Sequence, residues 1–163
     1  MQRELPERLL RELLKNSKRS DRELAKVLGV SQPTITRIRH KLEQEGVIRD
    51  YTIIPDFKKL GFEIMAIEFV KISPEKLSPE TTERAERFTA RFPNTIFVSA
   101  GEGLGMNGVS ISFYRNYSEY MDRMNQSRNE WKDLFVDLQS FVIALGEGEY
   151  KALSLTYLKD VPL

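Results

Sequence analysis

The chain has 163 residues, of which 40% are hydrophobic and 30% charged, a balance typical of a folded protein. It contains no cysteine, which excludes disulfides, thiolate nucleophiles and cysteine metal sites. It also lacks an apolar run of about 18 residues that would span a membrane. Because the amino terminus has no apolar signal core, we expect a cytoplasmic protein.

Charge is divided unevenly along the chain. Residues 1–61 hold 14 Lys and Arg against 9 Asp and Glu, whereas residues 62–163 hold 11 basic and 15 acidic residues. The net charge of +1 therefore conceals a basic first third and an acidic remainder. The basic part favours a polyanionic partner, and the change of sign indicates two domains.

Two helices joined by a tight turn are predicted at the start of the chain. Leucines recur at helical spacing over residues 5–16. Ser20 and Glu23 form a capping-box pattern that opens a second, short helix, which ends at Gly29. This spacing is that of a helix-turn-helix once a third helix follows.

The third helix is expected between Ser31, a good N-cap, and Gly46, which suits a left-handed stop. One face carries Ile35, Ile38 and Leu42, and the opposite face is polar. Side chains on and beside that polar face are suited to base edges and phosphates in a major groove. We expect DNA contacts from Ser31, Gln32, Pro33, Thr34, Thr36 and Arg37, with His40, Lys41 and Arg49 directed to phosphates.

A short hairpin is predicted after the third helix. Val47-Ile48 and residues 51–54 are strand-like and flank the polar pair Arg49-Asp50, and Pro55 ends the second strand. A hairpin at this place would be the wing of a winged helix-turn-helix. We therefore expect a DNA-binding domain over 1–54 and a connector over 55–61.

Residues 62–163 are predicted to form an α+β domain. Strands are expected at 62–72, 95–100, 109–114, 141–145 and 153–157, with helices from Ser78-Pro79 to about Arg91 and from Asn116 to about Phe135. The order β-α-β-β-α-β indicates a ferredoxin-like sheet with both helices on one face. The other face would be apolar, and a second subunit is expected to cover it.

The first domain resembles the DNA-binding half of the Lrp/AsnC, or feast/famine, transcription regulators. The resemblance rests on Leu24–Ser31, Thr34–Glu43, Glu45–Tyr51 and Leu60-Gly61, and it covers residues 5–61. Residues 62–163 are similar to that family's ligand-sensing, dimer-forming domain only in the order and length of their elements. The resemblance implies a DNA-binding homo-oligomer, at least a dimer, and it supports these two properties better than it supports response to a small effector.

A glycine-rich stretch lies where the resemblance implies the effector site. The family carries a Gly followed closely by an Asp there, but residues 100–108 contain no Asp. The candidate effector contacts are Gly101, Glu102, Gly103, Gly105 and Asn107. The string Gly103 to Gly108 also fits G-x-G-x-x-G, but a strand follows it instead of a helix, so we reject dinucleotide binding. An exposed hairpin loop or an oligomer contact is the alternative.

The favoured function is a dimeric or larger DNA-binding transcription regulator without catalytic activity. We expect no cofactor and no metal, since His40 is the only histidine and no other ligands cluster beside it. One alternative is an enzyme, because some proteins that share this architecture are haem-pathway decarboxylases. The absence of His and Cys from residues 62–163 argues against it. The other alternative is a partner-binding module without a DNA site of its own.

Overall fold

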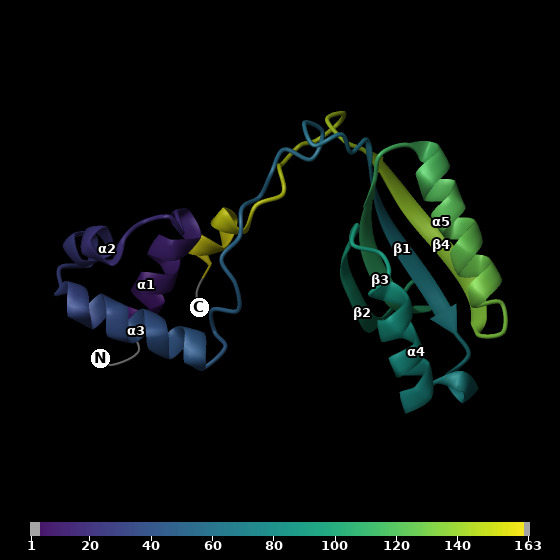
Figure 1. Cartoon of the computed structure of the whole chain (residues 1–163), viewed down its shortest axis with the longest axis horizontal. Coiled ribbons are helices and arrows are strands. Elements are labelled where there is room, and N and C mark those ends of the chain that lie inside the picture. Colours follow the sequence, from purple (N-terminus) through teal and green to yellow (C-terminus); the bar gives the residue numbers. More distant parts are fainter. Residues whose placement is uncertain (1–3, 162–163) are drawn as a thin grey trace. The chain divides into compact units, whose positions relative to one another are not determined.

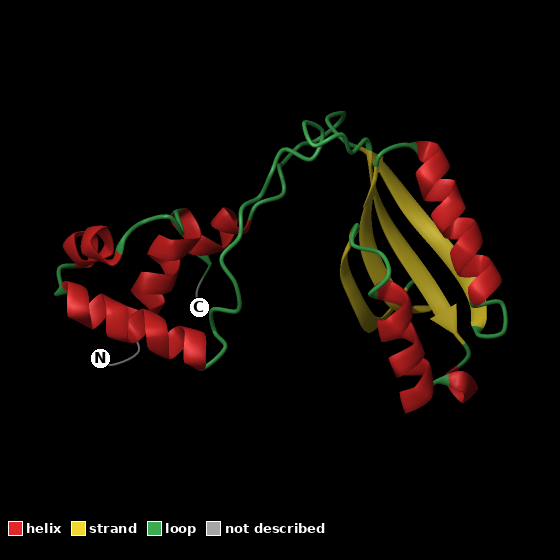
Figure 2. Cartoon of the chain, viewed as in Figure 1, coloured by secondary structure: helices red, strands yellow, loops and turns green. Residues whose placement is uncertain are grey.

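The computed structural model describes residues 4–161, which divide into two compact units (Figures 1 and 2). The first unit contains residues up to Ile54 together with the segment from Lys151 onward, and the second runs from Pro55 to Tyr150. No helix in the described range is long and apolar enough to cross a membrane.

The first unit is helical. It contains α1 (Glu4–Lys15), α2 (Asp21–Leu28), α3 (Gln32–Gln44) and the 3-10 helix η2 (Leu155–Asp160). The first three helices pack around a shared apolar core that consists of Leu9, Leu13, Leu24, Ala25, Leu28, Ile35 and Leu42. These are the positions that helical spacing places on one face of each helix, so the three-helix prediction is confirmed.

Caps fix the ends of α2 as the sequence indicates. The Ser20 hydroxyl accepts from the Glu23 backbone N–H, and the Glu23 carboxylate accepts from the Ser20 N–H at 2.8 Å. These bonds lower the pKa of Glu23 below its usual range. Gly29 ends the helix with φ of 72°, a left-handed conformation that a side chain would disfavour. The turn into α3 is therefore encoded locally.

The two predicted hairpin strands after α3 are absent, since residues 47–54 contain no strand. The Arg49-Asp50 tip lacks the Gly or Asn that a tight two-residue hairpin requires. Tyr51 is instead tied to α3, because its hydroxyl donates to the Glu43 carboxylate at 2.8 Å. The segment consequently does not fold back on itself.

The second unit is a four-stranded antiparallel sheet in the order β2-β3-β1-β4, with α4 and α5 on one face (Figures 1 and 2). Its elements are β1 (Ile64–Ile72), the short 3-10 helix η1 (Pro74–Lys76), α4 (Pro79–Thr89), β2 (Thr95–Gly103), β3 (Met106–Tyr114), α5 (Tyr117–Glu130) and β4 (Phe135–Ala144). The ferredoxin-like prediction is confirmed. However, α5 ends before the expected Phe135, because Trp131 already leaves helical geometry with φ of −110°.

The predicted fifth strand at 153–157 is also wrong. Ser154 caps η2 instead, with its hydroxyl accepting from the Thr156 N–H at 3.1 Å. The helix packs on α1, where Arg11 Nη1 donates to the Lys159 carbonyl at 2.8 Å. Residues 151–161 therefore group with the helical unit, although the sequence prediction assigned them to the sheet domain.

The sheet has two different faces. Alternate residues of β1, among them Ile64 and Ala66, point toward the helices and are buried. Residues 55–61, predicted as a connector, belong to the sheet unit, and Phe57 stacks on Phe113 with ring centroids 4.1 Å apart. The face of the sheet opposite α4 and α5 has no helix over it in residues 55–150. It carries partly or largely exposed apolar side chains, including Ile67, Phe97 and Phe141.

Candidate nucleic-acid interface

The third helix starts with a side-chain cap. Ser31 has extended backbone geometry, and its hydroxyl accepts from the Thr34 N–H at 3.4 Å and lies 2.8 Å from the Thr34 hydroxyl. Pro33 occupies the first turn, where a missing N–H costs little. The remaining free N–H groups of this turn give α3 a partly positive end, which suits a phosphate.

The two faces of α3 have different environments. Ile35 is fully buried and Leu42 is 6% exposed, so both anchor the helix in the core. The predicted contact residues Gln32, Pro33, Thr36, Arg37, His40 and Lys41 are exposed, and Thr34 is half-buried. The structure thus brings these side chains together on one solvent-facing helix. Arg49 is exposed as well, but it lies in the irregular segment after α3.

A polar network holds α3 against α2. Arg39 Nη2 lies 2.7 Å from Asp21 Oδ1, and both side chains are about one-fifth exposed, at 18% and 19%. The same guanidinium donates to the Tyr51 hydroxyl and to the Arg19 carbonyl, both at 3.4 Å. Tyr51 in turn donates to Glu43. Arg39 therefore links three segments of the unit and does not belong to the exposed face.

The charge of Arg39 is stabilised within this network. Burial disfavours the charged guanidinium, but the hydrogen bond to Tyr51 and the charge of Asp21 outweigh burial, so the pKa of Arg39 is raised. Burial and the bond to Glu43 raise the pKa of Tyr51. Both shifts favour the protonated forms, in which Arg39 and Tyr51 act as hydrogen-bond donors.

Some of the predicted contact residues have partners inside the unit. The Thr36 hydroxyl donates to Asp21 Oδ2 at 2.6 Å, so this hydroxyl is already engaged within the unit. His40 Nε2 lies 3.0 Å from Gln44 Nε2, and Lys41 lies 3.6 Å from Glu45 in an exposed pair. Such exposed pairs contribute little to stability.

The predicted effector residues lie on an exposed hairpin. Gly101, Glu102 and Gly103 end β2, and Gly105 forms the turn with φ of 75°. Asn107 differs from them, because its amide bonds the Ile72 backbone N–H and carbonyl at 2.9 and 2.6 Å. The Asn107 side chain therefore joins β3 to the end of β1.

The sequence reasoning missed two features of the helical unit. Arg39 pairs with Asp21, and neither this partner nor the part played by Tyr51 was predicted. The spacing of apolar residues did not predict that η2 packs on α1, because Leu153, Leu155 and Tyr157 alternate as in a strand.

Comparison with known proteins agrees with this arrangement. Residues 2–49 match the family described as "Winged helix-turn-helix DNA-binding". The chain is 34% identical over 94 residues to the HTH-type transcriptional regulator LrpA of Pyrococcus abyssi, a match covering 58% of this chain and 64% of LrpA. It is 42% identical over 145 residues to an uncharacterized HTH-type transcriptional regulator of Pyrococcus horikoshii, covering 83% of this chain and 93% of that protein.

Solved structures share the fold across both units. An AsnC family transcriptional regulator from Agrobacterium tumefaciens has a TM-score of 0.75 at 21% identity, covering 94% of this chain and 97% of that chain. A Neisseria meningitidis transcriptional regulator in complex with L-Met has a TM-score of 0.73 at 17% identity, with the same coverage. From the long match to the Pyrococcus horikoshii protein and the shared architecture, the chain belongs to the Lrp/AsnC family of HTH-type transcription regulators.

Proposed function

We propose that the protein is a sequence-specific regulator that binds double-stranded DNA through α3. The carrying observation is the exposed face from Gln32 to Lys41 on a helix whose other side is locked into the core. Gln and Arg offer donors that the major-groove edges of bases accept, and Lys supplies salt-dependent affinity. Gln32 and Arg37 are the candidates for base contact, and Lys41 and Arg49 for phosphate.

Selection of bound genomic fragments by the purified protein, followed by affinity measurements, tests this proposal. Arg37→Ala should weaken binding to a selected site by about 1–3 kcal/mol and affect random DNA less. Lys41→Ala should weaken both to a similar degree and reduce the salt dependence. An equal loss on both DNAs for Arg37→Ala would show that it contacts phosphate only. Failure to enrich any fragment would favour a partner-binding module.

We infer that the active form is at least a dimer, assembled through the open face of the sheet. Phe141 is 64% exposed and Phe97 49% exposed on that face, and large exposed apolar patches mark association sites. A two-fold dimer would place two α3 helices about one helical turn, 10 bp, or a multiple apart. Sedimentation velocity of the full chain measures the oligomeric state directly.

We propose further that a small effector acts through the hairpin that holds Gly101, Glu102, Gly103 and Gly105. Supporting this, the turn is exposed, and a Cβ added at Gly101, Gly103 or Gly105 would meet no atom within 4 Å, so the hairpin leaves room for a ligand or a second chain. The Neisseria regulator binds L-Met, which makes L-methionine the first probe. DNA affinity unchanged by a panel of amino acids would count against effector control.

We propose no enzymatic activity and a cytoplasmic location. Residues 62–163 contain neither His nor Cys, which general acid–base or thiolate chemistry would use. A coloured tetrapyrrole that remains bound to the purified protein would support the decarboxylase alternative instead.

A further inference from the structure

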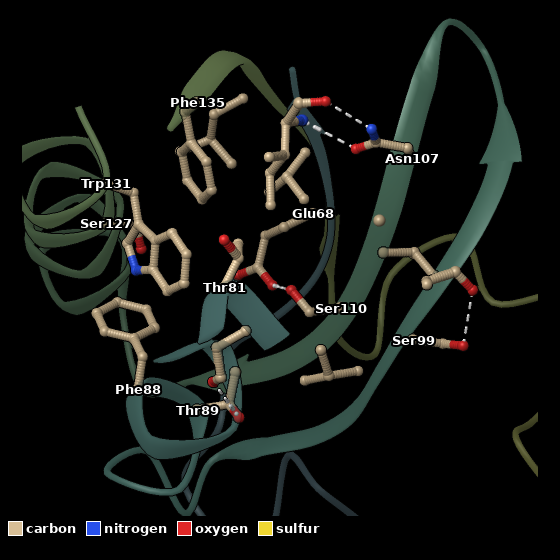
Figure 3. A pocket seen from close by; sticks show the side chains of 18 of the residues that line it. Glu68, Thr81, Phe88, Thr89, Ser99, Asn107, Ser110, Ser127, Trp131 and Phe135 are labelled. Carbon is tan, nitrogen blue, oxygen red and sulfur yellow. Dashed lines mark hydrogen bonds between the residues drawn. The ribbon is translucent and has the colours of Figure 1, made fainter. Parts of the chain in front are cut away.

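A cavity of about 510 Å³ lies in the second unit between the sheet and its two helices (Figure 3). Its wall includes residues of β1, β2, β3 and β4 and of both α4 and α5. Figure 3 shows Glu68 and Ser110 on the sheet side and Phe88, Trp131 and Phe135 around the opposite side. This cavity is separate from the α3 surface, and a pocket of this size suits a small molecule.

The cavity exists because the side chains on both walls are short. On α4, Thr81, Ala85 and Thr89 recur at four-residue spacing and all face the space. On the sheet, Ala100 and Gly108 contribute almost no volume. Larger side chains at these five positions would fill the gap, as in an ordinary packed interior.

One buried carboxylate, that of Glu68, gives the cavity a charged hydrogen-bond acceptor. Glu68 is 4% exposed, and its oxygens accept from the hydroxyls of Ser110 at 2.5 Å, Ser112 at 3.1 Å and Tyr114 at 2.6 Å. An ionised carboxylate offers about four acceptor positions. Two of these bonds go to Oε2 and one to Oε1, so the described contacts leave a position on Oε1 for another donor.

The charges that line the cavity favour a cation. Glu68 and Glu86 contribute two carboxylates against one guanidinium, that of Arg123. The Arg123 guanidinium is already engaged, since it stacks on the rings of Phe88 at 4.5 Å and Phe92 at 3.6 Å and donates to Ser127. Aromatic rings on the far wall would also attract a cation. Arg123 Nε and Trp131 Nε1 are buried donors of the described lining without a hydrogen-bond partner, so the preference for a cation depends on the open acceptor position of Glu68.

We propose that this cavity binds a small apolar primary amine, with its ammonium group on Glu68 and its apolar body against Phe88, Trp131 and Phe135. The ligand would enter beside Leu77 and Val98, which line the cavity but are 54% and 48% exposed. This site goes beyond the proposed DNA binding and does not depend on it.

Tryptophan fluorescence tests the proposal on the full chain, because Trp131 is the only tryptophan and lines the cavity. Three probes share an apolar body and differ in the polar group, namely 2-phenylethylamine, 2-phenylethanol and 3-phenylpropionate. We expect saturable binding of the amine, one per chain by calorimetry. The amine should bind about tenfold or more tighter than the alcohol, as a charge-assisted hydrogen bond implies. The acid should not bind.

Two variants distinguish the contribution of the cavity volume from that of the Glu68 carboxylate. Ala85→Phe fills the space and should abolish binding of every probe. Glu68→Gln should remove the preference for the amine while retaining binding of the alcohol. Glu83→Gln, the same change at an exposed position of α4, should leave all affinities unchanged. Circular dichroism confirms that each variant is folded.

Three outcomes would overturn the proposal. The first is no saturable binding of 2-phenylethylamine at millimolar concentration. The second is binding of 3-phenylpropionate as tight as that of the amine. The third is an unchanged amine affinity in folded Ala85→Phe. None of these outcomes bears on DNA binding by α3, so the two proposals can fail independently.

Discussion

Arg37 and Arg39 lie two positions apart on α3, and the structure predicts opposite consequences for the same substitution. Arg39→Met keeps the volume and apolar stem but removes the guanidinium that bonds Asp21, Tyr51 and the Arg19 carbonyl. Asp21 would then retain the Thr36 hydroxyl alone among these partners. Arg37→Met removes a charge from an exposed position. The first change should loosen the helix, and the second should weaken DNA binding without loosening it.

The magnitude follows from the burial of the pair. Exposed ion pairs contribute about 0.2–1 kcal/mol, whereas breaking a fully buried pair costs about 3–5 kcal/mol. With side chains 18% and 19% exposed, the Arg39–Asp21 pair lies between these limits. We therefore expect Arg39→Met to lower local stability by about 1–3 kcal/mol. Arg37→Met should change it by less than about 0.5 kcal/mol.

Native-state hydrogen exchange of the α3 amides in the full chain measures this difference, because it reports the helical unit separately from the sheet. A double-mutant cycle with Asp21→Asn isolates the pair. The coupling should survive high salt, unlike that of the exposed Lys41–Glu45 pair. Unchanged exchange in Arg39→Met, with a loss of DNA affinity, would refute the positioning role and make Arg39 a contact residue.

Three further changes probe the caps, the sheet and its open face. An added Cβ at Gly108 would lie 2.7 Å from Val70 Cγ2, so Gly108→Ala should destabilise the sheet unit by about 1–3 kcal/mol in thermal unfolding. Phe141→Glu should shift sedimentation toward monomer while Phe141→Leu should not, since position 141 is 64% exposed on the open face. Ser20→Ala should cost about 1 kcal/mol of helix stability in hydrogen exchange. Because the cap lowers the pKa of Glu23, its contribution is complete above pH 4.5 and is lost as the pH falls through the lowered pKa, which an NMR titration of the Ser20 amide would follow.

Local signals explain which parts of the fold were predictable. The helices were predicted correctly because neighbouring residues determine their caps and turns, as with Ser20, Gly29 and Ser31. The ferredoxin-like order followed from alternating strands and helical stripes, which depend on burial against a shared core. The exposed face of α3 followed from the same periodicity. Nothing beyond neighbouring positions was needed.

The wrong secondary-structure predictions occur where contacts with residues distant in the sequence determine the structure. Residues 153–157 alternate as a strand does, but a strand needs an edge to pair with, and the chain here forms η2, which packs on α1 and accepts a hydrogen bond from Arg11. The predicted hairpin strands at 47–54 are absent, and Tyr51 instead bonds Glu43 of α3, a contact that no hairpin rule includes. The cavity was equally hidden, because it depends on short side chains from α4, β2 and β3 that meet only in the folded unit.

The position of η2 has a consequence for how the two units communicate. The chain leaves the helical unit after Ile54 and returns to it at Lys151, so the sheet unit is inserted between two parts of the helical one. The two ends of the sheet unit are Pro55 and Tyr150. A change in the distance between them would therefore act on the segment that carries Tyr51 and on η2, which packs on α1. Tyr51 bonds α3 through Glu43 and Arg39, so the chain connects the sheet unit covalently to a segment that contacts α3. Such coupling requires only that the ligand bind two spacings with different affinity.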